Sequence, residues 1–247
     1  MASGDGSRVG IICRPHHHVF ETVGRRLDRR GHQVTYFEPE RELPRSAIEE
    51  LSLLVCKKVR PASVRALKAA ERAGVATWNG LLSTTILASR LVMLEALSAV
   101  GFRVPPVTFE PPEGPYVAKP LFSWDGDPEI GGSGGFYQPL LDTDGRDRKC
   151  YLVDDGRALH AATVVCSSKL FGEKRVLDHE STPDRDVDRM AQLLSLADTE
   201  AIGVDVIEAD GRRYAVDCNA APSFRQAGLE SALTDSIHRA VPSTDTG

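Results

Sequence analysis

The sequence predicts an α/β fold in which an open parallel sheet at the amino terminus precedes a two-lobed region of α+β structure. Residues 8–13 form a continuous apolar run, as expected of a strand buried on both faces. Residues 19–30 place apolar side chains at helical spacing, and residues 33–37 are again strand-like. This β-α-β order predicts a parallel sheet. Segments 147–165 and 202–219 each contain two apolar arms around an Asp-Gly turn, which is typical of hairpins.

The remaining elements follow from the same periodicities. Helices are predicted where apolar residues recur every three to four positions, at 62–73, 87–100, 184–196 and 224–240. Strands are predicted where short apolar or β-branched runs lie between breaking residues, at 51–56, 75–78 and 116–120. Strands and helices therefore alternate at the amino terminus, and hairpins dominate the second half of the chain.

Composition and charge exclude several classes of function. With 247 residues, 41% of them hydrophobic and 26% charged, the chain resembles an ordinary globular protein. No apolar run is long enough to span a membrane and the amino terminus lacks the order of a signal peptide, so we expect a cytoplasmic protein with no membrane partner. A net charge of −5 argues against nucleic-acid binding. The five cysteines have no C-x-x-C spacing and are predicted to be buried, reduced thiols.

The second hairpin carries three side chains with oxygen ligands. A two-residue loop at 210–211 would place Asp205 and Asp217 on opposite faces of the hairpin. A three-residue loop at 209–211 places Asp205, Asp217 and Asn219 on one face, and we therefore expect that loop. Two carboxylates and an amide oxygen form a set that Mg²⁺ or Mn²⁺ prefers when phosphates complete the coordination. The alternative is that Asp217 and Asn219 only end a strand and begin a turn.

The hairpin resembles a known metal-binding signature. The segments Gly203-Val204-Asp205 and Asp217-Cys218-Asn219, with Pro222, resemble that of the ATP-grasp superfamily in its RimK-like and glutathione synthetase-like branch. The family usually has Glu where this chain has Asp217, which leaves open whether one or two metal ions bind. The resemblance implies a pre-ATP-grasp domain at 1–80, a small central lobe with a glycine-rich loop at 81–137, a carboxyl-terminal lobe with the metal hairpin at 138–241 and a flexible tail at 242–247.

Further motifs in the family's order support the resemblance. The strand Val117-Ala118-Lys119-Pro120 carries a lysine, and the glycine cluster 131–135 follows it. Taken singly, the lysine could be a solvent-facing edge residue and the cluster a flexible loop. In the family such a loop folds over the triphosphate, because glycine lets backbone N–H groups approach the oxygens. Arg90 takes the place of the family's first nucleotide-binding lysine, so the resemblance implies that Lys119 and Arg90 bind phosphates.

The same resemblance implies the rest of the site. Residues 135–141 resemble the hinge that binds adenine, and because Pro139 has no N–H the donor must be Leu140 or Leu141. Lys149 stands where the family usually has an arginine, and a basic phosphate contact is expected near residues 169–175. The implied nucleotide-binding residues are Arg90, Lys119, Gln138, Pro139, Leu140, Leu141, Asp147, Lys174 and Arg175. The implied metal ligands are Asp205, Asp217 and Asn219, and the implied catalytic residues are Lys149 and Arg225.

The activity that the resemblance implies is an ATP- and Mg²⁺-dependent carboxylate–amine or carboxylate–thiol ligase that forms an acyl phosphate and ADP. Its partners would be a small-molecule carboxylate and an amine nucleophile, and it allows a homo-oligomer. Two alternatives remain, a small-molecule kinase and a degenerate protein that binds nucleotide without turnover. The acid is not indicated. Four basic residues at the carboxyl edge of the predicted sheet either bind its carboxylate or form a solvated rim, namely Arg14, Lys57, Lys58 and Arg60.

Overall fold

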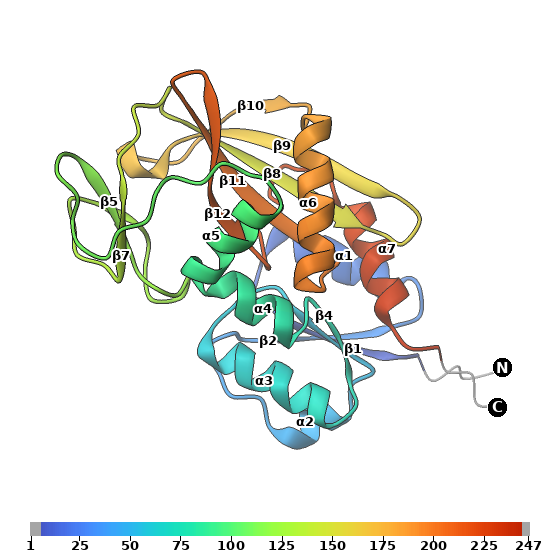
Figure 1. Ribbon diagram of the computed structural model, residues 1–247. Coiled ribbons are helices and arrows are strands. Elements are labelled where there is room, and N and C mark those ends of the chain that lie inside the picture. Colours follow the sequence, from blue (N-terminus) through green and yellow to red (C-terminus); the bar gives the residue numbers. More distant parts are fainter. Residues whose placement is uncertain (1–5, 244–247) are drawn as a thin grey trace.

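The computed structural model describes residues 6–243, which form three sheets with helices around them (Figure 1). The amino-terminal sheet has the strand order β2-β1-β3-β4 and all its pairs are parallel, which confirms the predicted open parallel sheet. Its elements are β1 (Arg8–Ile12), α1 (His18–Asp28), β2 (Gln33–Phe37), α2 (Arg45–Glu49), β3 (Leu53–Cys56), α3 (Pro61–Arg72) and β4 (Ala76–Trp78).

The central strand β1 is apolar along its length because helices cover both faces of the sheet. Val9 and Ile11 pack into a core with α1 and with α7 (Glu230–Ala240). Ile12 points to the other face and packs with α2 and α3. The carboxyl end of this sheet, where ligands gather in open α/β folds, faces the rest of the molecule.

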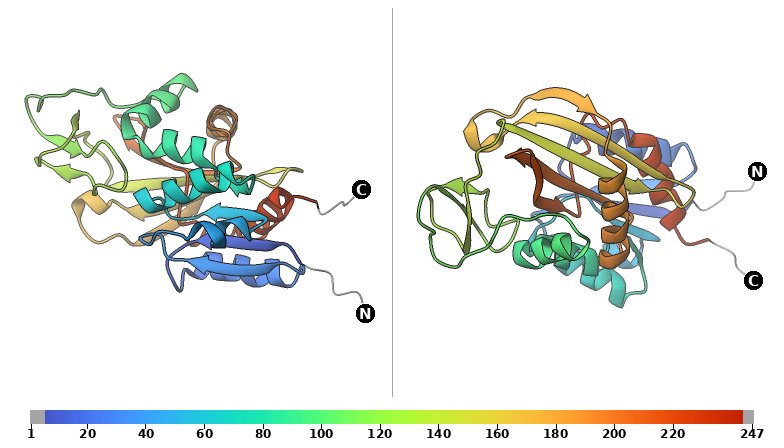
Figure 2. Two further views of the ribbon diagram at one scale, coloured as in Figure 1. Left: turned by 90° about the horizontal axis from the view of Figure 1, so that it is seen from below. Right: turned by 45° about the horizontal axis from the view of Figure 1, so that its top comes forward.

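The carboxyl-terminal sheet is antiparallel, with the order β10-β9-β8-β11-β12. One face packs against α6, and the other shares the core of the amino-terminal lobe with α1 and α7. The central strands of the sheet are therefore held between two helical layers, as Figures 1 and 2 show, whereas β10 is exposed along its length. Its elements are β8 (Arg146–Asp154), β9 (Leu159–Ser167), the 3-10 helix η1 (Lys169–Phe171), β10 (Val176–Glu180), α6 (Asp184–Ala197), β11 (Ala201–Ala209) and β12 (Arg212–Asn219).

A small central lobe projects to one side of the molecule (Figure 2). Its sheet has the order β6-β5-β7 and is antiparallel. Two helices precede it and pack against the carboxyl-terminal sheet and α6. These elements are α4 (Leu81–Ala88), α5 (Arg90–Ala99), β5 (Tyr116–Lys119), β6 (Glu129–Ile130) and β7 (Phe136–Pro139).

The predicted single helix over 87–100 is wrong, because two helices meet at Ser89. Ser89 has an extended backbone and forms an isolated bridge with Phe122, in the loop after β5. The Arg90 N–H donates to the Leu121 carbonyl at 2.8 Å. A continuous helix would have used these backbone groups internally, so pairing with a distant loop breaks it.

Smaller differences from the predicted elements lie at the ends of the chain and on its surface. The helix α2 was not predicted, and α7 begins at Glu230 rather than near residue 224. Residues 244–247 of the predicted tail lie outside the described residues. Within 6–243, no helix has the length and apolarity that a membrane span requires. The five cysteines are buried and unpaired, as expected.

Candidate functional site

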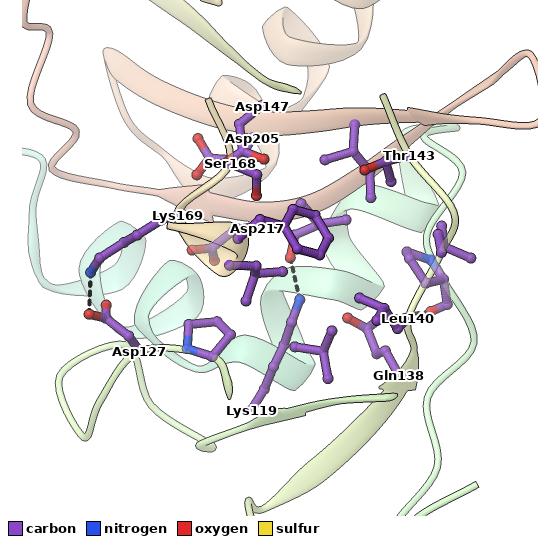
Figure 3. A pocket seen from close by; sticks show the side chains of 18 of the residues that line it. Lys119, Asp127, Gln138, Leu140, Thr143, Asp147, Ser168, Lys169, Asp205 and Asp217 are labelled. Carbon is purple, nitrogen blue, oxygen red and sulfur yellow. Dashed lines mark hydrogen bonds and ion pairs between the residues drawn. The ribbon is translucent and has the colours of Figure 1, made fainter. Parts of the chain in front are cut away.

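A cavity of about 310 Å³ lies between the central lobe and the carboxyl-terminal sheet (Figure 3). One wall comes from β5, β7 and the segment before β6, and the other from β8, β11, β12 and the η1 loop. Four lysines and four aspartates line it, so charges of both signs are concentrated in one place. These residues are Lys119, Lys149, Lys169, Lys174, Asp127, Asp147, Asp205 and Asp217.

Asp205 and Asp217 lie directly opposite each other on β11 and β12. The predicted three-residue loop is wrong, because the strands are joined by the two residues 210–211, both with left-handed backbone as a tight hairpin loop requires. The pairing register shifts next to Asp205, which leaves Val216 as the extra residue of a bulge. The bulge, rather than the loop, brings the two carboxylates onto one face.

Asn219 continues this face of β12 but borders a second space. It pairs with Gly203 and lies two residues beyond Asp217, so the side chains of Asp217 and Asn219 point to the same side. A side-chain carbon at Gly203 would lie 2.8 Å from Pro222. The glycine and proline of the signature are therefore in contact, and their packing sets the course of the chain after Asn219.

Lys149 lies beside this pair of carboxylates. Its Nζ is 2.5 Å from Oδ2 of Asp205, and both side chains are largely buried. Burial alone would lower the pKa of Lys149, but the charge and hydrogen bond of Asp205 outweigh burial and raise it. Burial, and then the charge of Asp205, raise the pKa of Asp217. The same two causes raise the pKa of Asp147 on β8. The charge of Asp205 thus disfavours a second carboxylate beside it, and a bound cation would relieve this repulsion.

Lys119 reaches across the cavity from β5 toward the strand that carries Asp217 (Figure 3). Its Nζ donates a 2.8 Å hydrogen bond to the carbonyl of Val216, and its side chain is buried. Burial lowers the pKa of Lys119 to about 8, although Asp217 acts in the opposite direction. A buried, incompletely paired lysine in a cavity is a strong candidate for binding an anion.

The opposite end of the cavity is apolar and belongs to the predicted hinge. Gln138, Pro139, Leu140 and Leu141 all line it. The Leu140 N–H donates to the Pro115 carbonyl, so of the two donors that the resemblance implied only the Leu141 N–H would be available to a ligand. Nε2 of Gln138 donates to the Pro105 carbonyl, while its buried Oε1 has no hydrogen-bond partner among the described residues. A buried acceptor without a partner at a cavity wall is suited to a ligand N–H group.

Arg90 lies elsewhere than the resemblance implied. It is buried outside the lining of the cavity, and its guanidinium donates to three backbone carbonyls of the loop after β5. Each donor–acceptor distance is 3.0 Å, and the acceptors are Pro120, Phe122 and Gly126. The guanidinium of Arg90 therefore holds a loop that borders the cavity. The resemblance had implied instead that Arg90 contacts a phosphate directly.

The glycine cluster 131–135 also does not line the cavity. It forms the turn between β6 and β7, where a side-chain carbon at Gly134 would lie 2.7 Å from the backbone of Lys119. Glycine is therefore required there for close packing of two strands. The segment that borders the cavity is Asp127 and Pro128, in the connection between β5 and β6.

The basic loop before β10 supplies one of the two predicted contacts. Lys174 lines the cavity, whereas Arg175 does not and pairs with Glu173 at 2.9 Å. Lys169 also lines it and forms an ion pair with Asp127 across the mouth (Figure 3). Sequence reasoning missed Asp127 as a lining residue, because only the path of the loop after β5 brings it there.

Arg225 is exposed and lines neither of the two cavities described for this chain. It lies between Phe224 and Gln226, which both have left-handed backbone. Its charge lowers the pKa of His17 and Lys57, after the larger effect of burial. Arg225 therefore lies near the edge of the amino-terminal sheet and not in the cavity that holds Asp205 and Asp217.

The fold of this chain is similar to those of solved structures, whereas its sequence matches no known family profile and no curated protein. Among solved structures, an ATP-grasp protein with a RimK domain from Sphaerobacter thermophilus is 15% identical, with a TM-score of 0.70 over 94% of this chain and 100% of that one. The ATP-grasp ligase PsnB, solved with a minimal precursor variant, Mg and ADP, is 17% identical, with a TM-score of 0.68 over 96% and 99%. D-alanine–D-alanine ligase from Bacillus anthracis is 12% identical, with a TM-score of 0.67 over 96% of each chain.

Proposed function

We propose that this chain, which has the ATP-grasp fold, is an ATP- and Mg²⁺-dependent ligase that joins a carboxylate to an amine or a thiol through an acyl phosphate. The observation that carries the proposal is a single cavity in which four lysines surround a cross-strand pair of aspartates. Phosphoryl transfer requires cations around the phosphates and carboxylates that hold a divalent ion. Similar folds in solved ligases support the same reaction class.

The two ends of the cavity suit the two ends of ATP. The unpaired Oε1 of Gln138 would accept a hydrogen bond from the exocyclic amino group of adenine, and the Leu141 N–H would donate to the ring. Lys119, whose Nζ lies at Val216 beside Asp217, and Lys174, which lines the same cavity, would contact phosphate oxygens. Phosphates would replace the Val216 carbonyl with a stronger, charged acceptor for Lys119.

The residues present fit a magnesium ion. Asp205, Asp217 and Asn219 would hold it with hard oxygen ligands on one face of the hairpin. Among residues 6–243 there is no cluster of three His, Cys, Asp or Glu side chains that would form a closed site, and this suits an ion whose coordination is completed by phosphates. The ion would neutralise the charge on the phosphate oxygens during transfer.

The side chains of the chain itself would position the reactants. The substrate carboxylate attacks the γ-phosphorus, the P–O bond to ADP breaks, and the resulting acyl phosphate reacts with the amine to release phosphate. Lys119 and Lys174 would hold the charged oxygens in line for this attack, since positioning supplies much of the rate in such reactions. Lys149 would keep Asp205 oriented toward the cavity through their ion pair.

Hydroxylamine trapping tests the proposal. The protein, ATP and Mg²⁺ are incubated with a panel of amino acids and dicarboxylates, and both ADP and hydroxamate are measured. A ligase of this class gives hydroxamate and ADP with at least one acid. ADP with a stable phosphate ester and no hydroxamate would indicate a kinase, and nucleotide binding without ADP release would indicate a degenerate site. The Asp217→Asn variant serves as the control for contaminating ATPase activity.

A further inference from the structure

A second cavity, of about 60 Å³, lies where the three lobes meet. The amino-terminal lobe contributes the connection after β3, and the central lobe contributes the end of α4 and the loop after β5. The chain after β12 completes the wall. Its polar lining residues are Lys58, Arg60, Ser123 and Asn219.

The two cavities are close together along β12. Asp217 lines the larger cavity and Asn219 lines the smaller one. Two residues of a strand span about 7 Å, and both side chains point to the same side. A group held in the small cavity therefore lies beside the proposed metal and phosphate end of the large one.

The small cavity has an excess of positive charge. Arg14 and Arg60 both contact the same carboxylate, Glu40, at 3.1 and 3.7 Å. Lys58 lies next to them, half-buried, and its Nζ forms no ion pair or hydrogen bond within the described part of the chain. Burial and the charges of Arg60 and Arg14 lower the pKa of Lys58. Three cations thus face two carboxylates, Glu40 and Asp127, and because Asp127 is already paired with Lys169, a ligand anion would relieve their repulsion.

The size of the cavity limits what can enter it. A water molecule needs roughly 10–15 Å³ of such volume, so the space holds about four to six heavy atoms. That is enough for a carboxylate group with about one to three further heavy atoms. The walls next to it are the apolar side chains of Val59, Leu87 and Ala88. A quaternary carbon next to the carboxyl group, as in pivalate with its seven heavy atoms, would exceed this volume.

We propose that the small cavity binds the reacting carboxylate of the acid substrate, with Lys58 as its main cation and Arg60 and Asn219 beside it. The substrate is then an acid without a quaternary carbon next to its carboxyl group. This inference rests on the proposed function, because that function supplies the acid. Of the four basic residues that the sequence singled out, only Lys58 and Arg60 remain as residues that bind the carboxylate. Lys57 instead lies buried against the Ala221 carbonyl, and Arg14 remains exposed on Glu40.

Lysine labelling tests the site without turnover. The protein with Mg²⁺ and ADP is briefly treated with formaldehyde and borohydride, and methylation of each lysine is measured by peptide mass spectrometry. Sodium propionate should slow methylation of Lys58 severalfold, whereas the branched acid pivalate at equal ionic strength should not. Exposed Lys68 serves as the internal reference. Equal effects of both acids, or no effect of either, would overturn the inference.

Steady-state kinetics provides the second readout. Lys58→Met should raise the KM for the acid at least about tenfold and leave the KM for ATP nearly unchanged. Lys68→Met, on the exposed face of α3, should change neither. Equal acid KM values in the wild type and Lys58→Met would contradict the inference. If no acid yields hydroxamate with the wild type, the ligase proposal fails, and the labelling experiment still decides whether the cavity binds a carboxylate.

Discussion

Lys119 donates a hydrogen bond of 2.8 Å from its Nζ to the carbonyl oxygen of Val216. Val216 is the extra residue of the bulge that places Asp205 and Asp217 on one face. A single carbonyl therefore connects the lysine of the central lobe to the carboxylates of the carboxyl-terminal lobe. This bond aligns the two halves of the proposed nucleotide site.

Replacing Lys119 with methionine should weaken nucleotide binding. The variant keeps much of the buried volume but removes the charge that phosphates would contact, so we expect the Kd for Mg·ADP to rise at least about tenfold. Titration calorimetry measures this. Arg175→Met is the matched control, since Arg175 lies on the neighbouring basic loop but pairs with Glu173 outside the cavity. Equal affinity in Lys119→Met and the wild type would remove the central residue of the proposed site.

Replacing Asp217 with asparagine should abolish turnover while leaving the fold intact. The change removes one anionic ligand without changing the shape of the side chain, and a loss of several kcal/mol of transition-state stabilisation reduces the rate by roughly two orders of magnitude or more. ADP release is measured against Mg²⁺ concentration. The idea fails if Asp217→Asn retains wild-type turnover with the same Mg²⁺ dependence.

Replacing Arg90 with lysine tests whether this residue holds the loop 120–126 or contacts a phosphate directly. A lysine keeps the charge but cannot reach three carbonyls at once, so the loop 120–126 should loosen and its amide hydrogens should exchange faster in the protein without nucleotide. We expect nucleotide affinity to fall as a consequence. Unchanged exchange in this loop, together with weaker binding, would instead favour the direct phosphate contact that the sequence suggested.

Short-range patterns in the sequence predicted the helices and strands whose formation depends on the burial of one or both faces. The apolar run of β1 and the helical spacing of α1 and α6 identified these elements within a few residues of their ends. Lys119 lies on a predicted strand, and the structure places it in the lining of the cavity. These predictions succeed because the spacing of apolar side chains along the sequence shows which face of a helix or strand is buried.

Features that depend on distant backbone contacts were missed. The break at Ser89 exists because the neighbouring backbone pairs with residues 121–123, and no local residue marks it. The bulge at Val216 similarly has no Gly or Pro to signal it. Parity along the hairpin linked the length of the loop to the faces on which Asp205 and Asp217 lie, but it could not tell a longer loop from a bulge.

Replacing Gly203 with alanine should destabilise the protein through steric overlap. The added carbon would lie 2.8 Å from Pro222 and 3.1 Å from the Tyr151 ring, in a packed region. Overpacking of this kind costs about 1–3 kcal/mol. Urea unfolding measures the free energy. Gly132→Ala is the control, because its added carbon would meet only the side chain of exposed Glu129. Equal stability of the two variants would contradict the packing argument.

The last prediction concerns the pH dependence of stability, which Lys57 should influence. Burial lowers the pKa of Lys57 from 10.5 to about 8. Its Nζ donates only to the Ala221 carbonyl and lies 5.7 Å from the Phe20 ring centroid. The folded state therefore holds the proton of Lys57 less tightly than the unfolded state does.

The direction of this pH dependence follows from the lower pKa of Lys57 in the folded state than in the unfolded state. Below about pH 8 the lysine is charged in both states, and the full cost of burying the charge opposes folding. That cost is relieved as pH rises from about 8 to 10.5, where the folded protein alone loses the proton. The Lys57→Met variant has no ammonium group to bury, so its stability does not include this pH-dependent cost. The stability of the wild type relative to Lys57→Met should therefore increase by up to about 3 kcal/mol between pH 7 and pH 10.5.

Urea unfolding of the two proteins at several pH values measures this difference, and taking the difference cancels the titration of other groups. Lys68→Met, which changes an exposed lysine on α3, should run parallel to the wild type over the same range. A constant difference between the wild type and Lys57→Met from pH 7 to 10.5 would mean that the ammonium group is solvated in the folded protein. The buried position of Lys57 against Ala221 would then be wrong.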